Sequence, residues 1–562
     1  MCAEFESFAQ RVLNYGLSQP DANACVFQSR GPETAQVLSW AQLRQQVQAR
    51  ASLLLEHGLA GQPVALIFPA GNEFVIDFLA CLYAGVIAVP LNLSRNAQQF
   101  SRTLEIMEDA GVTAVLTTAK TESFLQGALQ ELASDYQPQL WLDEQVQSAQ
   151  IHVPEPVQPD ELAFIQYTSG STSRPKGVMV SHASILDNQQ AIQQACQHEA
   201  GLIAGGWLPQ FHDMGLIGHM MQPLYLGGCY VFMPPMNFIQ RPRRWLELIS
   251  DYRIHSSASP DFGYEHCVKF ITAREDLSGL DLSCWKVALN GSEPVNHATM
   301  ARFAEKFAPH GFDPQAFFPC YGMAETTLFV SGGAPGNGVK TRHFDSTAFA
   351  AGTLREAAQG IEVVSCGLIS PAFALTIVNP DTCAPCADET IGEIWLHGPS
   401  VAQGYWKNSE QTQAGFQAQL NNEDARQWLR TGDLGFVRDG ELFVTGRIKE
   451  LIILRGRNIY PYDIERTCNN YPQASGGGAA VFAVERDGTT RLAAIVELSK
   501  AAFINGDHTE MALDIKGLVM DASEVTLDIL CLVKPGTIPR TTSGKIRRVA
   551  CKDLLPQLEA LS

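Results

Sequence analysis

The stretch Gln-Tyr-Thr-Ser-Gly-Ser-Thr-Ser-Arg-Pro-Lys-Gly at residues 166–177 is the most informative dozen residues of this chain. It follows the apolar run Leu-Ala-Phe-Ile at residues 162–165, which predicts a buried strand ending at a turn. Glycine lets a backbone approach a ligand closely, hydroxyl groups donate hydrogen bonds, and lysine adds a mobile positive charge. Strand and loop together therefore predict a flexible cradle for phosphate oxygens.

The loop differs from a Walker A motif, in which Gly-Lys is followed at once by Ser or Thr. Here Pro175 precedes Lys176, and Gly177 follows it. Most clusters of glycine and serine are solvated turns, and this alternative stays open on the loop alone. The order of strand, hydroxyl run and Arg-Pro-Lys-Gly favours phosphate binding.

Length and charge limit the classes of function. With 562 residues, of which 46% are hydrophobic, the chain can form several domains with their own cores. The net charge of -19 argues against a nucleic-acid partner, because phosphate backbones require a basic surface. The first residues resemble no signal peptide, and no apolar run is long enough to span a bilayer. The 14 scattered cysteines are typical of reduced thiols, so we expect a cytoplasmic protein, and we expect it to be a monomer.

Strand and helix signals alternate along the first half of the chain. A capping box beginning at Ser39 opens a helix that ends near Gly58, and strand-like runs follow at residues 64–68, 86–89 and 112–116. Such alternation predicts the α/β class, with mostly parallel sheets covered by helices. The close pair Cys383 and Cys386 lies between two strand-like runs and predicts a hairpin loop, with a redox or zinc motif as the alternative.

Polar turns follow several predicted strands. Asn290-Gly291 comes after residues 285–288, and Tyr321-Gly322 comes after a run around residues 317–318. Open α/β sheets bind ligands at the carboxyl edge of their strands, so we expect these turns to line one nucleotide cleft. Asp433 in Thr-Gly-Asp-Leu-Gly reads as a carboxylate held in a glycine turn, which suits a ribose diol. An ordinary hairpin loop is the alternative.

Two more segments carry candidate residues. His212 and Asp213 are followed by Met-Gly, which indicates a polar corner facing an apolar cleft, although a lone histidine is more often a structural hydrogen-bonding group. A new region of α+β character begins near Gly446 and contains Lys545 in a Ser-Gly turn. The basic residues around this lysine, Arg540, Arg547 and Arg548, form a possible surface for an acidic partner.

In this order, from about residue 10 to about residue 553, the motifs resemble the adenylate-forming (AMP-binding) enzymes. The resemblance implies a large N-terminal adenylation domain over residues 1–445, with several subdomains of which one is β-barrel-like. It implies a hinge at residues 446–450 and a small mobile α+β domain over residues 451–562. It also implies ATP and Mg²⁺ as cofactors.

The resemblance assigns roles to individual residues. Thr168 to Lys176 would hold the pyrophosphate, Tyr321 would stack on adenine, and Glu325 with the Thr172 hydroxyl would hold magnesium. Asp433 and Arg447 would bind the ribose, and Lys449 would be the hinge residue. The implied nucleotide-binding residues are Thr168, Ser169, Gly170, Ser171, Thr172, Lys176, Asn290, Gly291, Ser292, Tyr321, Gly322, Met323, Asp433 and Arg447. The implied acyl-binding residues are His212, Asp213, Met214, Phe262, Gly291 and Met323, and the implied catalytic residues are Lys545, Glu325, Thr172 and the gate His212.

Within this family the chain resembles most the fatty acyl-AMP ligases. Branch-like pieces lie at residues 208–216, 238–245, 290–295 and 456–461, and residues 340–360 resemble the insertion of that branch. In the branch the insertion restrains the small domain, so that coenzyme A is not used. The implied activity is ATP-dependent conversion of a fatty acid to an acyl-adenylate with release of pyrophosphate. The acyl group then passes to the phosphopantetheine thiol of an acyl carrier protein, in a polyketide or lipopeptide type of pathway.

Three alternatives remain open from the sequence: a fatty acyl-CoA synthetase, an amino-acid-activating domain, and a nucleotide-binding module without catalysis. One residue departs from the family pattern, which commonly has Pro-Asn-Phe-Ala-Tyr where this chain has Pro-Asp-Phe-Gly-Tyr at residues 260–264. Asp261 is therefore interpreted either as a partner for a polar group of the substrate or as a solvated side chain. We expect it to face solvent.

Overall fold

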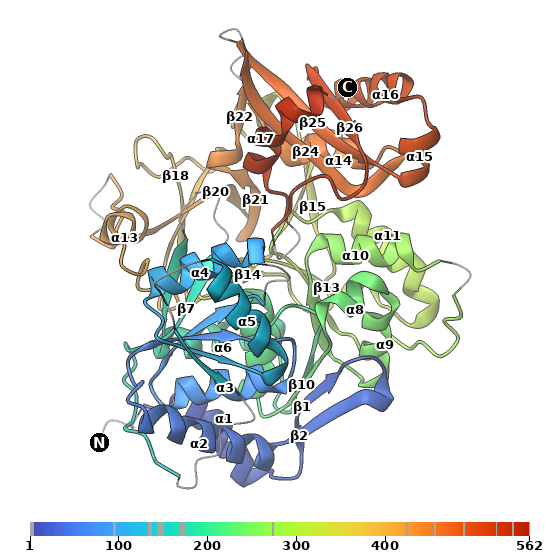
Figure 1. Ribbon diagram of the computed structural model, residues 1–562. Coiled ribbons are helices and arrows are strands. Elements are labelled where there is room, and N and C mark those ends of the chain that lie inside the picture. The colour runs from blue at the N-terminus through green and yellow to red at the C-terminus, as the bar shows by residue number, and fades with distance from the viewer. Residues whose placement is uncertain are drawn as a thin grey trace.

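The computed structural model (Figure 1) describes residues 5–93, 97–132, 136, 138–142, 151–168, 175–272, 275–421, 425–454, 457–486, 489–523, 525–541 and 545–560. Within these residues the strands form a six-stranded, a thirteen-stranded and a three-stranded sheet together with two two-stranded pairs. Helices lie between and around the large sheets, and the C-terminal part lies above them.

The six-stranded sheet carries the phosphate stretch at one edge. Its order is β6-β5-β3-β4-β7-β8, and its neighbours are parallel except for the antiparallel pair β7 and β8. The strands are β3 (Pro63–Ile67), β4 (Ile87–Leu91), β5 (Ala114–Thr117), β6 (Gln139–Leu142), β7 (Leu162–Thr168) and β8 (Lys176–Ser181). Every residue of β3 and β4 is buried, as expected for parallel strands covered on both faces. The predicted parallel sheet is confirmed.

The thirteen-stranded sheet has a parallel half and an antiparallel half. The parallel strands run β13-β12-β11-β9-β10-β1, and β2 pairs antiparallel at the end. These strands are β1 (Asn23–Gln28), β2 (Ala35–Ser39), β9 (Ile203–Gly206), β10 (Cys229–Phe232), β11 (Ser256–Ser259), β12 (Val287–Asn290) and β13 (Phe317–Gly322). Beyond β13 follow β14 (Phe329–Gly332), β17 (Leu368–Ile369), β21 (Glu441–Arg447), β20 (Leu429–Arg438), β19 (Gly392–His397) and β18 (Ala374–Val378), all antiparallel to their neighbours. These six strands form the antiparallel arm of the sheet, and the β-barrel-like subdomain stays a prediction.

Helices cover both sheets. They are α1 (Phe8–Ser18), α2 (Trp40–Glu56), α3 (Asn72–Tyr83), α4 (Ala97–Ala110), α5 (Ala119–Glu131), α6 (His182–Cys196), α7 (Gln222–Tyr225), α8 (Pro235–Gln240), α9 (Arg243–Asp251), α10 (Asp261–Phe270), α11 (His297–Phe307) and α13 (Ser409–Phe416). The capping box is confirmed, because the Ser39 side chain accepts a hydrogen bond from the Gln42 amide at the start of α2. An eight-residue π-helix, η3 (Met214–Met221), directly follows the predicted gate.

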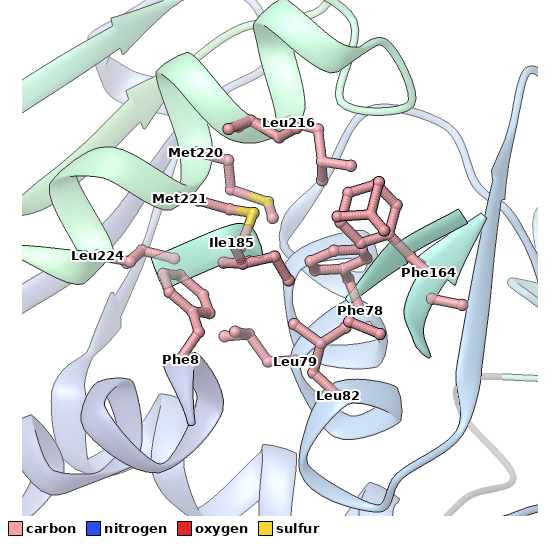
Figure 2. Close-up of a cluster of buried hydrophobic side chains, with 14 of the residues drawn as sticks. Phe8, Phe78, Leu79, Leu82, Phe164, Ile185, Leu216, Met220, Met221 and Leu224 are labelled. Carbon is pink, nitrogen blue, oxygen red and sulfur yellow. The ribbon is translucent and has the colours of Figure 1, made fainter. Parts of the chain in front are cut away.

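The main core lies between the two large sheets. Figure 2 shows Phe78 of α3, Phe164 of β7, Ile185 of α6 and Met220 of the π-helix packed in one buried cluster. The same cluster contains residues of β3 and of β10, so the helices fill the space between the sheets. Close packing of this kind resists displacement of one sheet against the other. It therefore fixes the carboxyl edges of the two sheets relative to each other.

The C-terminal part has its own core. The sheet β24 (Ala474–Arg486), β25 (Thr489–Leu498) and β26 (Ile529–Val533) alternates its side chains, so that Val481 packs in one cluster and Phe482 in another. The remaining elements are β22 (Ile452–Leu454), β23 (Arg457–Ile459), α14 (Pro461–Asn469), α15 (Lys500–Asn505), α16 (His508–Ser523) and α17 (Arg548–Glu559). The α+β character is confirmed, whereas the boundary at residues 446–450 stays a prediction.

The insertion-like segment packs between the antiparallel arm and the C-terminal part. It forms β15 (Thr341–Phe344), α12 (Ser346–Ala350) and β16 (Ile361–Val364). The ring of Phe344 lies 5.2 Å from that of Phe436 in β20, and the ring of Phe349 lies 5.6 Å from that of Tyr460 beside β23. Buried apolar contacts therefore tie the segment to both sides.

The loop with Cys383 and Cys386 has the predicted form, whereas the segment around Asp433 does not. Cys383 and Cys386 are free thiols beside the β18–β19 pair, where Val378 bridges Pro385, so the predicted hairpin loop is confirmed. The glycine turn around Asp433 is wrong, because this residue lies inside strand β20 opposite Arg447. Gly432 alone has a positive φ of 71° there, and a register shift follows at Leu434 and Gly435. Among the described residues, no helix is long and apolar enough to cross a membrane.

Replacing Phe349 with alanine is expected to loosen the contact between α12 and the C-terminal part. Removing a buried phenylalanine typically costs about 3–5 kcal/mol, and Phe349 is 3% exposed. Hydrogen exchange should become faster in residues 457–460. The control is Phe270→Ala, because Phe270 is 59% exposed. Equal exchange in both variants would show that the segment does not restrain this region.

Candidate active site

Residues from both large sheets and from the C-terminal part meet at one site. Asn290 ends β12, Tyr321 lies near the end of β13, and Glu325 lies in the following 3₁₀ turn, η6 (Ala324–Thr326). Asp433 and Arg447 come from the antiparallel arm. The structure thus gathers at the carboxyl edge of the parallel strands the groups that the sequence predicted there.

A buried carboxylate organises the predicted ribose side. Asp433 is 4% exposed, and its Oδ2 accepts a 2.7 Å hydrogen bond from the Tyr321 hydroxyl. Its Oδ1 accepts a 2.9 Å bond from Nε of Arg447. The Asp433 carboxylate raises the pKa of Arg447, and burial together with Asp433 raises the pKa of Tyr321. The sequence suggested an adenine-stacking role for Tyr321 but gave no sign of this hydroxyl bond.

The two ends of the phosphate stretch lie on paired strands. Thr168 and Lys176 face each other in the antiparallel pair β7–β8, so Lys176 belongs to a strand rather than to the loop. A Cβ atom on Gly177 would lie 2.6 Å from Ile165 and 2.8 Å from Tyr167, which explains why glycine follows the lysine. The predicted phosphate ligands Ser169, Gly170, Ser171 and Thr172 lie outside the described residues.

Tyr405 joins the two charged groups of the phosphate side, and the sequence analysis missed it. Its hydroxyl donates a 2.9 Å hydrogen bond to Oε1 of Glu325, and Nζ of Lys176 lies 4.9 Å from the centre of its ring. Burial raises the pKa of Glu325, and the Tyr405 bond counteracts that rise. Burial and the neighbouring charge of Lys449 lower the pKa of Lys176, so the predicted hinge lysine is close to this group. The only sequence signal for Tyr405 was its place in the Gly-Tyr-Trp motif at residues 404–406.

The predicted gate histidine contacts a carboxylate at a helix start. Nδ1 of His212 lies 2.7 Å from Oδ1 of Asp213, which also accepts a 2.6 Å bond from the Met214 amide and caps the π-helix. Burial would raise the pKa of Asp213, but the charges of His212 and Lys545 hold it at about 2. The carboxylate is therefore ionised at neutral pH. Position 215 requires glycine, because a Cβ atom there would lie 2.1 Å from the Pro209 carbonyl oxygen.

The expectation that Asp261 faces solvent is wrong. Asp261 is 8% exposed, and its Oδ1 accepts 2.9 Å hydrogen bonds from the Asn290 side chain and the Asn296 amide. Burial, followed by the nearby Glu293, raises the pKa of Asp261 to about 7. Glu293 in turn accepts a 2.7 Å bond from the Phe262 amide at the start of α10. Sequence spacing could not reveal these bonds, because the partners are 29 to 35 residues apart.

The predicted turns keep close backbone contacts. A Cβ on Gly291 would lie 2.8 Å from Cys320 Sγ, and one on Gly322 would lie 1.9 Å from the Leu328 carbonyl oxygen. Ser292 has a φ of 73°, which is uncommon for a residue with a side chain. Met323 donates its amide hydrogen to Leu328. The Phe262 ring lies 5.7 Å from the buried ring of Trp207, so this part of the predicted acyl side is aromatic.

Lys545 reaches this site from the C-terminal part. Burial and the nearby Arg447 lower the pKa of its ammonium group, whereas Asp213, Glu293 and Asp433 favour the charged form. These partners belong to three different segments of the N-terminal part. The expected basic surface around the lysine is wrong for Arg548, which forms ion pairs with Glu450 at 2.7 Å and Glu465 at 2.6 Å.

The donor set fits ATP with a divalent cation. The described residues contain no group of three metal-ligating side chains, and Mg²⁺ usually binds one or two carboxylates together with substrate phosphates. The buried Glu325 carboxylate is such a ligand. Oδ1 of the fully buried Asn290 has no hydrogen-bond partner within the described chain, so it leaves an acceptor for a ligand.

A cavity of about 880 Å³ lies elsewhere, between α8, α9 and α10. None of the predicted site residues lines it. Its lining includes Arg241, Arg243 and Arg244, but Glu247 and Glu275 also line it, and Arg243 pairs with Glu247 at 2.7 Å. The charges nearly cancel, so this cavity does not compete as the phosphate site.

Comparisons with known proteins agree with this geometry. A family model described as AMP-binding enzyme matches residues 15–406. The medium-chain-fatty-acid–[acyl-carrier-protein] ligase JamA of Moorena producens (strain JHB) is 38% identical, over 98% of this chain and 95% of the relative. A solved structure from studies of fatty acyl-adenylate ligases of E. coli and L. pneumophila has a TM-score of 0.88 at 32% identity and covers 100% of both chains. The fatty acyl-adenylate ligase of L. pneumophila, solved with acyl adenylate and pyrophosphate, has a TM-score of 0.77 at 34% identity and covers 99% of this chain and 97% of that one. The chain therefore belongs to the AMP-binding enzymes and, within them, to the fatty acyl-AMP ligases.

Proposed function

We propose that this chain activates a fatty acid with ATP to an acyl-adenylate, releases pyrophosphate, and passes the acyl group to the phosphopantetheine thiol of an acyl carrier protein. The observation that carries the proposal is the convergence of Lys545, the Asp433–Arg447 pair and Glu325 on one site. The names of the relatives, a fatty-acid–[acyl-carrier-protein] ligase and fatty acyl-adenylate ligases, support the choice of substrate and acceptor.

In the first step a carboxylate oxygen of the fatty acid attacks the α-phosphorus of ATP. The new P–O bond replaces the bond to the bridging oxygen, and pyrophosphate leaves with that electron pair. Both reactants are anions, so the residues act by positioning them and by offsetting charge. Lys545 is assigned to the reacting carboxylate and α-phosphate, and Lys176 to the departing pyrophosphate.

Other residues hold the nucleotide. Asp433 would accept further bonds from the ribose hydroxyls beside those from Tyr321 and Arg447, since an ionised carboxylate accepts several hydrogen bonds. The Tyr321 ring is assigned to adenine. Magnesium bound with ATP supplies positive charge next to the phosphates, and Glu325 with the Thr172 hydroxyl would hold it.

In the second step the thiol loses its proton to solvent and its sulfur attacks the acyl carbonyl carbon. The bond between that carbon and the phosphate oxygen breaks, and AMP leaves with the electron pair. His212, oriented by Asp213, is assigned to the gate between acyl pocket and nucleotide, with Met214, Phe262, Gly291 and Met323 around the acyl group. Lys449 is assigned to the hinge about which the small domain moves between the two steps. The packing of residues 340–360 against Tyr460 supports a restraint on this motion.

The proposal includes a monomer in the cytoplasm. The cysteines in the described part of the chain are all free thiols, which supports a reducing compartment. The net charge of -19 supports solubility without a nucleic-acid partner.

Replacing Lys545 with alanine is expected to slow acyl-adenylate formation by about 10²–10³-fold, because a group that offsets charge in the transition state is lost. ATP binding should change little, since the residues assigned to adenine, ribose, magnesium and the pyrophosphate group remain. Pyrophosphate release measures the first property and calorimetry the second. Lys534→Ala, at an exposed lysine of the same C-terminal part, is the matched control. A rate near that of the unmodified protein would contradict the assignment.

The pH dependence of acyl-adenylate formation should reflect the titration of Lys545. The charged form is the active one, and burial lowers the pKa of Lys545 from its ordinary 10.5, so activity should fall with rising pH below that value. In Lys545→Arg the guanidinium stays charged, so any remaining activity should lack this basic limb. An unchanged limb in that variant would assign it to another group.

The acceptor is tested by mixing the protein with ATP and dodecanoate, and with either coenzyme A or a phosphopantetheinylated carrier protein. We expect a thioester on the carrier and stalled acyl-adenylate with coenzyme A, both read by mass spectrometry. Release of acyl-CoA would instead identify a fatty acyl-CoA synthetase.

A further inference from the structure

We propose that Tyr405 is a positioning residue that holds the Glu325 carboxylate and the Lys176 ammonium group in place, and so sets how readily the site accepts a divalent cation with ATP. The proposal rests on the roles given above to Glu325 and Lys176. It adds a residue for which the motif analysis gave no function.

The backbone around Tyr405 is fastened to the strand that follows the phosphate stretch. Tyr405 forms an antiparallel bridge with Val178 of β8. The Trp406 amide donates a 2.7 Å hydrogen bond to the Gly177 carbonyl, and the Met179 amide donates a 2.9 Å bond to the Gly404 carbonyl. The segment thus acts as an added strand, and its position is fixed to that of Lys176.

The same segment is fastened to the other sheet. The Ala402 amide donates a 2.9 Å hydrogen bond to the backbone carbonyl of Glu325, which follows β13. The Tyr405 ring packs edge-on against Phe416 of α13, with 5.1 Å between ring centres and 82° between planes. Backbone and ring contacts therefore leave the Tyr405 side chain little freedom between the two sheets.

From this position Tyr405 contacts both charged groups. Its hydroxyl donates to Oε1 of Glu325 at 2.9 Å, and its ring lies 4.9 Å from Nζ of Lys176. A hydroxyl that donates to a carboxylate stabilises the charged form, and an aromatic face stabilises an ammonium group. Among the described residues, no ion pair joins Lys176 to Glu325. Tyr405 thus keeps both charges in the site without letting them neutralise each other.

The hydroxyl and the ring are separable by substitution. Tyr405→Phe removes only the bond to Glu325, whereas Tyr405→Leu removes the ring as well. Tyr405→Phe therefore tests the bond to Glu325, and Tyr405→Leu tests the ring against Lys176 as well.

The matched control is Tyr471→Phe. The Tyr471 hydroxyl donates a 3.1 Å hydrogen bond to Oδ2 of Asp514, which is the same kind of contact in the C-terminal part, away from the site. If loss of any hydroxyl-to-carboxylate bond altered the activity through stability alone, this variant would reproduce the effect.

The test uses the full chain with ATP and dodecanoate. In Tyr405→Phe, the Mg²⁺ concentration for half-maximal pyrophosphate release should rise about tenfold, the size expected for a hydrogen bond to a charged group. In the absence of ATP and Mg²⁺, mass spectrometry should show acetic anhydride modifying Lys176 a few-fold faster in Tyr405→Leu and unchanged in Tyr405→Phe.

An unchanged Mg²⁺ requirement in Tyr405→Phe would overturn the inference and leave the proposed function standing. Equal rates of Lys176 modification in all variants would overturn the part of the inference that says that the Tyr405 ring holds Lys176. This measurement does not require an active enzyme. Failure of the unmodified chain to release pyrophosphate with any fatty acid would instead overturn the proposed function itself.

Discussion

The contact between the Asp433 carboxylate and Arg447 is the constraint on which the site depends. The two residues face each other across β20 and β21, and Arg447 directly precedes the 3₁₀ turn η7 (Ile448–Glu450), which contains the predicted hinge lysine. The Tyr321 hydroxyl, from β13 in the parallel half of the sheet, donates a hydrogen bond to the same carboxylate. One buried acid thereby fixes the cleft, the antiparallel arm and the start of the C-terminal part relative to one another. Burying a charged carboxylate without partners costs free energy, and the bonds from Tyr321 and Arg447 offset that cost for Asp433.

A second property of the site is its mixture of charges. A chain with a net charge of -19 must bind the phosphates of ATP, and it does so where a few cations lie among buried acids. Lys545 lies near Asp213, Glu293 and Asp433, and Lys176 lies near Glu325. The acids favour the charged form of each lysine, which burial disfavours, and the lysines compensate for the acids. Arrival of ATP would replace part of this pairing, so the ligand enters a site whose charges are already arranged.

Local features of the fold were predictable from the sequence because they depend on residues a few positions apart. The capping box at Ser39 depends only on Gln42, and short apolar runs indicate the parallel strands. The Cys383 and Cys386 loop followed from two flanking strands. Predictions failed where a side chain bonds to a distant segment. Asp261 looked like a surface acid, Asp433 like a turn residue, and Arg548 like part of a basic surface, yet each is held by residues between 14 and 112 positions away.

The α/β class, the order of the motifs and the resemblance to fatty acyl-AMP ligases could be recognised in the amino-acid sequence, because each depends on residues that are close together in the chain. That Lys545 lies near Asp213, Glu293 and Asp433, that Tyr321 bonds to Asp433, and that Tyr405 connects Lys176 with Glu325 became visible in the folded chain. Charge pairing and burial depend on distance in space, which the order of residues does not give. Tyr405 and Glu325 are 80 positions apart in the chain, and only the packing of two sheets brings their oxygens to 2.9 Å.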